Sequence, residues 1–233
     1  MGLSRVFVGS FLAAALLFYV FPELDIRFSM LFYDPVSRFY LADAPFCHYI
    51  YESVEIVSTA WVVLAFLLLT VLWIRKKPWF GLSAKHLIYL LAALAIGPGL
   101  IVNVVLKDNW GRARPYDVIQ FGGASVFTPA FAISSQCHHN CSFVSGHAAM
   151  GFYFIAFGFS RHKSVCRRRR SLLILLAGIY GVVVGLVRIL QGGHFLSDIV
   201  FAFFITYALS AVLYWIMFER KSSRETIHHH SGL

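Results

Sequence analysis

The stretch LIYLLAALAIGPGLIVNVVL, Leu87–Leu106, is twenty residues long and carries no charged side chain. A helix needs about 20 apolar residues to cross the hydrocarbon core of a bilayer. The stretch is therefore predicted to span a membrane, with a kink at Gly97–Gly99, which reads GPG. The composition agrees, because 59% of the chain is hydrophobic and only 13% is charged, whereas soluble domains carry about 25% charged residues.

Five other apolar runs predict further spans, so we expect an all-α bundle of six transmembrane helices that forms one domain, residues 1–233. The expected spans are Val6–Phe21, Ile56–Ile74, Leu87–Leu106, Ser142–Ser160, Leu172–Leu190 and Phe195–Phe218. The fourth run is the weakest, because Ser145 and His147 lie near its outer end. The first run is expected to stay as an anchor, because no clear small-x-small cleavage site lies before Phe21.

The basic residues predict which side of the membrane each loop faces. Fourteen of the twenty Lys and Arg residues fall on one side of the spans, which the positive-inside rule makes cytoplasmic. They are Arg5, Arg75, Lys76, Lys77, Lys85, Arg161, Lys163, Arg167, Arg168, Arg169, Arg170, Arg220, Lys221 and Arg224. Both termini are thus expected in the cytoplasm. The net charge of +9 follows from this topology, so nucleic acid is not an expected partner. The sequence leaves the oligomeric state open.

Six basic residues remain on the outer side, where the charge rule disfavours them, and a bound anion would explain their presence. They are Arg27, Arg38, Lys107, Arg112, Arg114 and Arg188. Three segments at this outer boundary carry polar residues of the kinds used in catalysis. They are KDNWGRARP (Lys107–Pro115), SGH (Ser145–His147) and RILQGGHFLSD (Arg188–Asp198).

The residue types in these segments suit a bound phosphate. Lys107, Arg114 and Arg188 offer cationic donors, and the arginines have a fork geometry that matches phosphate oxygens. Ser145 and Gly146 stand where a helix should begin, so free backbone N–H groups would face an anion there. The segments therefore predict a phosphate-binding site.

Two histidines predict proton transfer and nucleophilic chemistry beside that phosphate. His194 and Asp198 are four residues apart, so on one helical face the carboxylate would fix the tautomer of the imidazole. His147 supplies a second imidazole that is free to donate a proton. Arg112 is open between a second phosphate contact and a solvated charge.

Together the three segments resemble the signature of the type 2 phosphatidic acid phosphatase superfamily, K-x6-R-P, S-G-H and R-x5-H-x3-D in this order. That superfamily also includes vanadium haloperoxidases and bacterial acid phosphatases, and its membrane branch has six helices. The resemblance extends from the third expected span through the sixth. Two positions depart from it, since Val144 and Val187 replace the usual proline and serine.

The resemblance implies a metal-independent phosphoric monoester hydrolase without a cofactor. His194 would attack phosphorus to form a phosphohistidine, with Asp198 on its other nitrogen, and His147 would protonate the leaving oxygen and then activate water. The remaining motif residues would stabilise the equatorial phosphate oxygens: Lys107, Arg114, Arg188, Ser145 and the Gly146 amide. The three segments also lack a carboxylate cluster for two metal ions.

An outer site at the bilayer boundary suits a membrane lipid phosphate as substrate. The chain further resembles bacterial lipid A phosphatases in Pro22–Pro35, Phe121–Phe131 and Cys137–His147. We therefore expect removal of the 1- or the 4′-phosphate of lipid A, at the periplasmic face of a bacterial inner membrane. Phosphatidylglycerophosphate and undecaprenyl pyrophosphate are alternative substrates. A lipid transporter or interaction protein that retains the fold without catalysis is the alternative of another class.

Three cysteines fall on the expected outer side, where an oxidising periplasm permits disulfides. We expect Cys137 to pair with Cys141, and Cys47 is a competing partner. A structural zinc ion on the two loop cysteines and His138 or His139 is the less favoured alternative, because the ligands are too crowded for a usual zinc site.

Overall fold

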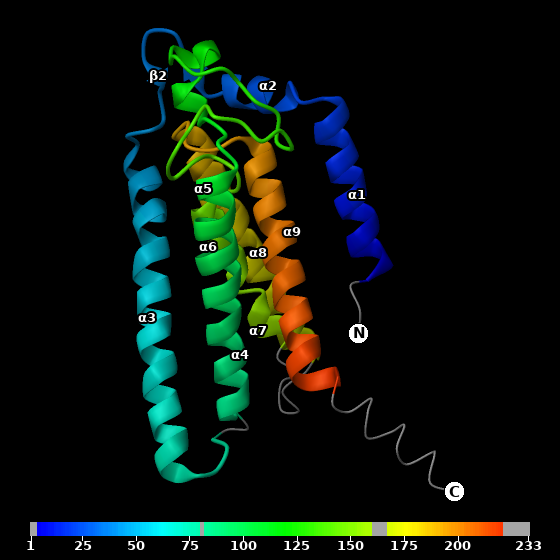
Figure 1. The fold of residues 1–233 in the computed structure, drawn as a ribbon. Coiled ribbons are helices and arrows are strands. Elements are labelled where there is room, and N and C mark those ends of the chain that lie inside the picture. The colour runs from blue at the N-terminus through cyan, green and yellow to red at the C-terminus, as the bar shows by residue number, and fades with distance from the viewer. Residues whose placement is uncertain (1–3, 80–81, 160–166, 221–233) are drawn as a thin grey trace, which may run out of the picture.

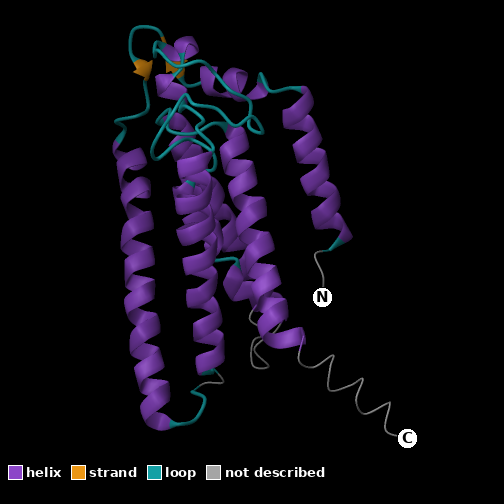
Figure 2. Cartoon of the chain, viewed as in Figure 1, coloured by secondary structure: helices purple, strands orange, loops and turns teal. Residues whose placement is uncertain are grey.

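Long helices packed side by side form the body of the chain, and short elements and loops gather at one end (Figures 1 and 2). This computed structural model describes residues 4–79, 82–159 and 167–220. The basic positions Arg161, Lys163, Lys221 and Arg224 lie outside the described residues. The elements, in chain order, are α1 (Arg5–Val20), α2 (Leu24–Met30), β1 (Tyr33–Asp34), β2 (Arg38–Phe39), α3 (Pro45–Arg75), α4 (Ala84–Leu94), η1 (Ala95–Leu106), α5 (Lys107–Asn109), η2 (Pro115–Asp117), η3 (Ile119–Phe121), α6 (Gly146–Tyr153), α7 (Ala156–Phe159), α8 (Arg167–Leu190), α9 (Leu196–Tyr214) and η4 (Trp215–Glu219).

Four helices are long and apolar enough to cross a membrane, which makes the chain a multi-pass membrane protein. They are Pro45–Arg75, Ala84–Asn109, Arg170–Leu190 and Leu196–Glu219. A fifth candidate is α1 together with α2, although the two helices meet at a bend of 83°. Among the described residues, length and composition thus support four or five spans, whereas the sequence predicts six.

The difference lies at the fourth expected span, Ser142–Ser160. Helix α6 begins only at Gly146, because residues 142–144 form a bend and Ser145, with an extended backbone, caps the helix. The helix is also interrupted between Tyr153 and Ala156, so Gly146–Phe159 is a short apolar helix. At about 1.5 Å per residue it covers roughly two thirds of the hydrocarbon thickness. Ser160 lies outside the described residues.

The second and third expected spans belong to longer helices than predicted. Helix α3 begins at Pro45, eleven residues before the expected start at Ile56, because proline suits the first turn of a helix. In the third span, Pro98 lies inside a π-helical stretch, Ala95–Leu106. Proline lacks the N–H that a regular helix needs at this point, so the sequence GPG alters the helix without ending it.

Helix α6 lies in the middle of the bundle, with α3, α8, α9 and η1 packed around it. Its backbone passes very close to α8, because a Cβ added to Gly151 would lie 2.8 Å from the Cα of Gly181. Small residues allow such close approach in membrane bundles. The α6 N-terminus is therefore fixed at the centre of the bundle end where the loops gather.

The loop end itself consists of α2, the β1–β2 hairpin and the long connection 110–145 (Figure 2). In the hairpin, Tyr33 pairs with Phe39 and Asp34 with Arg38. Phe39, Ala113, Val118, Phe121 and Phe195 form a buried cluster that joins the hairpin, the connection and the start of α9. These apolar contacts hold the loops against the helix ends that carry the three sequence motifs.

Candidate active site

His194 lies just before α9 and is fully buried. Its Nδ1 is 2.8 Å from the carbonyl oxygen of Ser142. A carbonyl can only accept a hydrogen bond, so Nδ1 carries the proton and Nε2 keeps a free lone pair. Among the described residues, Nε2 has no hydrogen-bond partner. This is the tautomer that a nucleophilic imidazole requires.

Burial lowers the pKa of His194 from its ordinary value of 6.5 to about 3. Asp198 opposes this shift, whereas the positive charges of Arg188 and Lys107 add to it. The imidazole is consequently neutral at physiological pH. A neutral ring is the nucleophilic form, so no proton has to leave before the ring can react.

Asp198 does not make the predicted direct hydrogen bond to His194, because its nearest oxygen lies 3.6 Å from Nδ1. Oδ1 instead accepts from Arg112 at 2.6 Å, while Oδ2 accepts from the Ser142 hydroxyl and from the Phe195 backbone N–H. The reason is that α9 begins at Leu196, so His194 stands before the helix and does not share its face. Ser142 therefore contacts both residues, with its hydroxyl donating to Asp198 and its carbonyl accepting from His194.

Arg112 is not a solvated charge, because its side chain is fully buried, whereas the alternative of a phosphate contact stays a prediction. Its guanidinium donates to Asp198 at 2.6 Å and to Asp25 at 2.7 Å. It also donates to the Ser197 hydroxyl and to the Thr128 carbonyl. Two buried carboxylates neutralise the charge of this arginine, so we assign it to holding the site together.

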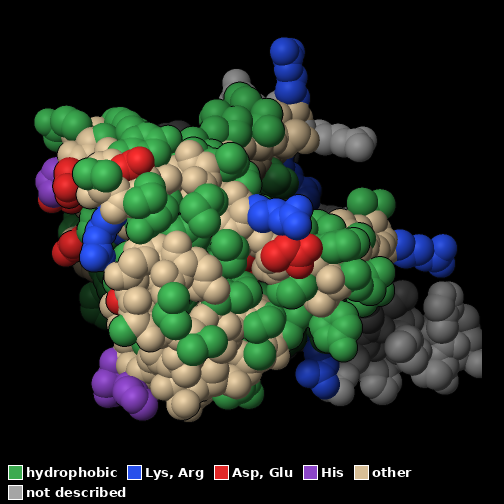
Figure 3. All heavy atoms as spheres, turned by 90° about the horizontal axis from the view of Figure 1, so that it is seen from above, with side chains coloured by type: hydrophobic (Ala, Val, Ile, Leu, Met, Phe, Trp, Pro, Cys, Tyr) green, Lys and Arg blue, Asp and Glu red, His purple; other side chains and the backbone are tan. Residues whose placement is uncertain are grey.

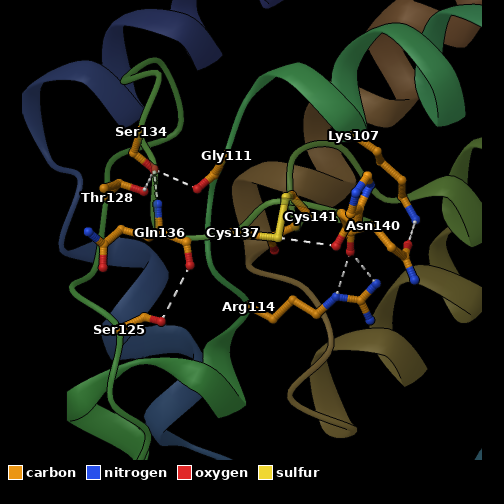
Figure 4. The surroundings of a disulfide bond; sticks show 12 residues. Lys107, Gly111, Arg114, Ser125, Thr128, Ser134, Gln136, Cys137, Asn140 and Cys141 are labelled. Carbon is orange, nitrogen blue, oxygen red and sulfur yellow. Dashed lines mark hydrogen bonds between the residues drawn. A yellow bond between two sulfur atoms is a disulfide. The ribbon is translucent and has the colours of Figure 1, made fainter.

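Lys107 and Arg114 approach one another at Asn140 (Figure 4). The ammonium of Lys107 donates to the Asn140 side-chain oxygen at 2.9 Å. The Arg114 guanidinium donates to the Asn140 backbone oxygen through Nε at 3.1 Å and Nη2 at 2.6 Å. Asn140 belongs to a loop closed by a disulfide between Cys137 and Cys141.

The cysteines adopt the arrangement that the sequence favours. With both loop sulfurs in the disulfide, they cannot serve as thiolate ligands for zinc. Cys47, the competing partner, is a buried free thiol.

The N-terminus of α6 faces the same region. The Ser145 hydroxyl accepts from the Ala148 backbone N–H as the helix cap. A Cβ added to Gly146 would lie 2.4 Å from the Asn103 side-chain oxygen and 3.3 Å from the Lys107 ammonium nitrogen. Only glycine fits between these groups, so the first amides of α6 lie beside the Lys107 ammonium.

Arg188 and His147 meet at Tyr51, which comes from the unpredicted first turns of α3. The His147 ring stacks on the Tyr51 ring, with 4.3 Å between centroids and 26° between planes. The Arg188 guanidinium lies 4.9 Å from the centroid of the Tyr51 ring and donates to the Gln191 side chain. A Cβ on Gly193 would lie 2.3 Å from Nη2 of Arg188, so the guanidinium lies directly over this glycine.

A family model described as PAP2 superfamily matches residues 85–222, which is more than half of the chain. The chain belongs to the PAP2 superfamily. The resemblance seen in the three sequence motifs is thus confirmed, and the chain is a phosphatase of this superfamily.

Among PAP2 relatives, the chain is similar to a lipid A 4′-phosphatase of Francisella tularensis subsp. novicida. The two are 39% identical over 213 residues, covering 89% of this chain and 92% of the relative. A lipid A 4′-phosphatase of Rhizobium leguminosarum is 38% identical over 130 residues, covering 56% of this chain and 54% of the relative. Phosphatidylglycerophosphatase B of Bacillus subtilis is 29% identical over 154 residues, covering 64% and 63%.

A solved structure shares the fold. It is the transmembrane PAP2 type phosphatidylglycerolphosphate phosphatase from Bacillus subtilis, with a TM-score of 0.58 and 18% sequence identity. The match covers 95% of this chain and 96% of that one. The whole chain, and not only its motif-bearing half, therefore has the architecture of a membrane PAP2 protein.

Four contacts of the PAP2 site could not be read from the motifs. Ser142 and Asn140 lie within Cys137–His147, so their closeness to the motif residues Ser145 and His147 was a usable signal. Asp25 is one of three carboxylates in the outer segment Pro22–Pro35, so the sequence did not single it out as the partner of Arg112. Tyr51 gives no signal, because a tyrosine at the end of an apolar helix is ordinary.

Proposed function

We propose that the chain is an integral-membrane phosphatase that removes the 4′-phosphate of lipid A through a phosphohistidine intermediate. The free Nε2 of His194 carries this proposal, because the nitrogen has no hydrogen-bond partner among the described residues and Nδ1 holds the proton. The choice of the 4′ position is supported by the name of the relative that is 39% identical over most of the chain.

In the first proposed step, the Nε2 lone pair of His194 attacks phosphorus and the bond to the lipid oxygen breaks. His147 gives a proton to that leaving oxygen. The proposed phosphate ligands are Lys107, Arg114, Arg188, Ser145 and the Gly146 amide, and the positive charges of Arg188 and Lys107 act on His194 directly. Their fixed positive charge would stabilise the equatorial oxygens as the transition state forms.

In the second step, His147 takes a proton from water, the water oxygen attacks phosphorus, and the N–P bond returns its electron pair to His194. Monoester hydrolysis requires accelerations of up to about 10²¹-fold. General acid–base catalysis supplies only about 10²–10⁴-fold. Covalent catalysis and preorganised positive charge must therefore supply most of the rest.

We further propose six spans, with the site at the periplasmic face of a bacterial inner membrane and both termini in the cytoplasm. Basic residues at the far end support this orientation, because Arg75, Lys76, Lys77 and Lys85 lie where α3 leads to α4 (Figure 1). The loop end displays apolar side chains among its charges (Figure 3), including Ile119, Val126 and Ile133. Such a surface suits the boundary of a bilayer, where a lipid head group could reach the site.

Phosphate release from purified lipids tests the proposal. The full chain should release phosphate from lipid A with an intact 4′-phosphate, and continue to do so in EDTA. His194→Ala should abolish release, whereas His48→Ala, at an exposed position on α3, should not. Equal release by wild type and His194→Ala would exclude the nucleophile. Activity lost in EDTA and restored by zinc would exclude the metal-independent route.

Trapping tests the intermediate separately. Enzyme quenched during turnover of ³²P-labelled substrate should hold label that resists alkali and is lost in acid, as expected for an N–P bond. The label should be absent from His194→Ala.

Phosphatidylglycerophosphate is the second candidate substrate, because a relative and the similar solved structure carry that activity in their names. Parallel assays with this lipid and undecaprenyl pyrophosphate will rank the three by kcat/KM. Lack of release from all three would favour the non-catalytic alternative.

A further inference from the structure

The segment 137–147 contacts Lys107, Arg114, His194 and Asp198, and its first residues are the least explained. Asn140 directs two oxygens at two cations, with the side-chain oxygen 2.9 Å from Lys107 and the backbone oxygen 2.6 Å from Nη2 of Arg114 (Figure 4). Ser142 supplies the acceptor for His194. We propose that Asn140 is a positioning residue that holds Lys107 and Arg114 in place for phosphate, and that the Cys137–Cys141 disulfide fixes Asn140 in this role.

Electrostatics give Asn140 a physical role. Lys107 and Arg114 are both positive and lie close enough to repel one another. Two amide oxygens between them offset that repulsion without adding a charge that would compete with phosphate. The two cations are thereby held in position before the substrate binds. Donors that are already ordered lose less conformational entropy when they bind an anion.

Backbone geometry explains why asparagine suits this position. Its φ is +52°, in the left-handed region that asparagine tolerates better than most other side chains. This conformation turns both oxygens of one residue towards the two cations. Alanine at 140 would lose the side-chain oxygen and disfavour the conformation, whereas glycine would lose only the oxygen.

The disulfide and two backbone hydrogen bonds connect the loop to the segment that carries the cations. The Cys141 N–H donates to the Lys107 carbonyl at 3.3 Å, and the Ser142 N–H donates to the Arg112 carbonyl at 2.8 Å. The sulfur bridge closes the loop on the other side of Asn140. Opening the bridge therefore frees one end of the residue that holds both cations.

Inorganic phosphate is the probe for this inference, which rests on the proposed phosphate site. The inhibition constant for phosphate, and kcat and KM for the lipid substrate, are measured for wild type, Asn140→Gly and Asn140→Ala. We expect the inhibition constant to rise roughly threefold for glycine, which loses one hydrogen bond, and roughly tenfold for alanine, which also disfavours the loop conformation. KM should rise in the same order. His138→Ala, an exposed neighbour in the same loop, should match wild type.

The double variant Cys137→Ser with Cys141→Ser tests the role of the bridge. It should weaken phosphate binding in the same direction as Asn140→Ala, and combining the two changes should add little, because both disturb one contact. Thermal unfolding of each variant checks that the fold is kept.

Three results would overturn the inference. Equal phosphate binding by wild type and both Asn140 variants would remove Asn140 from the site. Tighter binding by Asn140→Gly would show that the residue obstructs phosphate. A wild type that neither binds nor releases phosphate would overturn the inference together with the proposed function, whereas the first two results leave that function intact.

Discussion

Tyr51 shows how a single ring can serve two functional groups. It stacks on His147 at 4.3 Å and lies under the Arg188 guanidinium at 4.9 Å. The face of an aromatic ring carries negative charge density that attracts the Arg188 guanidinium, and the same ring offers a stacking surface to the His147 imidazole. The ring therefore holds the proposed general acid and a proposed phosphate ligand at a fixed separation.

Replacing Tyr51 should reduce catalysis in proportion to what remains of the ring. Tyr51→Phe keeps the face of the aromatic ring, so kcat/KM should stay within about twofold of wild type. Tyr51→Leu removes the aromatic ring. A cation–π contact worth about 0.5–2 kcal/mol predicts that kcat/KM falls by roughly 2- to 30-fold. Tyr49→Leu, at an exposed position on the same helix, is the matched control. An unaffected Tyr51→Leu enzyme would contradict this role.

The lowered pKa of His194 predicts how stability depends on pH. The folded pKa of about 3 lies below the ordinary value of 6.5, so the unfolded chain binds the extra proton first as the pH falls. This residue therefore costs no stability above about pH 6.5, and below it the protein loses up to about 1.4 kcal/mol per pH unit.

Comparing thermal unfolding at pH 7.5 and pH 5 in wild type and His194→Asn measures this effect. The asparagine side chain keeps a donor for the Ser142 carbonyl but does not titrate. Between pH 7.5 and pH 5, the unfolding temperature of His194→Asn should therefore fall less than that of wild type or of the control variant His48→Asn. Identical falls in all three proteins would show that His194 titrates normally.

At the scale of elements, the site depends on how closely α6 approaches α8. A Cβ added to Gly151 would lie 2.8 Å from the Cα of Gly181. Because that neighbour is backbone and not a flexible side chain, it cannot move aside easily. Helix α6 carries Gly146 and His147 at its start, so its distance from α8 also sets their position relative to Arg188.

Gly151→Ala should destabilise the protein by about 1–3 kcal/mol, as overpacking usually does. Gly178→Ala is the matched control on α8, because nothing lies within 4 Å of its added Cβ. Alanine is the better helix former, so this control should be neutral or slightly stabilising. The unfolding temperatures of the two variants are the measurement, and equal values would show that the two helices can separate without cost.

Most elements, but not all their limits, could be predicted from the sequence. Hydropathy located the helices that contain Leu87–Leu106, Leu172–Leu190 and Phe195–Phe218, because lipid selects long apolar runs. It placed the start of α6 too early, since Ser142 and Val144 precede the helix and are buried within the protein. It missed the first turns of α3 because hydropathy does not report helix that continues past the apolar run.

The site was predictable as far as its motifs reach. The motifs named His194, Asp198 and the cations that we propose to bind phosphate, but spacing alone suggested the direct His194–Asp198 bond that the structure lacks. Contacts between distant segments decide such details. Arg112 forms an ion pair with Asp25 of α2, and these two residues are far apart in the sequence. No local sequence pattern predicts that they lie together.

For the whole molecule, the orientation in the membrane is the decisive open prediction. On a Cys166→Ser background, Ile133→Cys lies on the loop end with 72% of its surface exposed, and Lys77→Cys lies at the opposite end. A membrane-impermeant maleimide should label the first in cells with a permeabilised outer membrane, and the second only after the inner membrane is opened. The reverse pattern would invert the proposed topology.

The stretch from Asn140 to His147 has a consequence for comparing relatives. Its first residue, Asn140, forms hydrogen bonds with Lys107 and Arg114, and the Ser142 carbonyl accepts a hydrogen bond from His194. The stretch ends in the first turn of α6, which is fixed by close packing. Inserting or deleting one residue there would shift every later attachment at once. Active relatives should therefore keep the length of this stretch constant even where its residues differ.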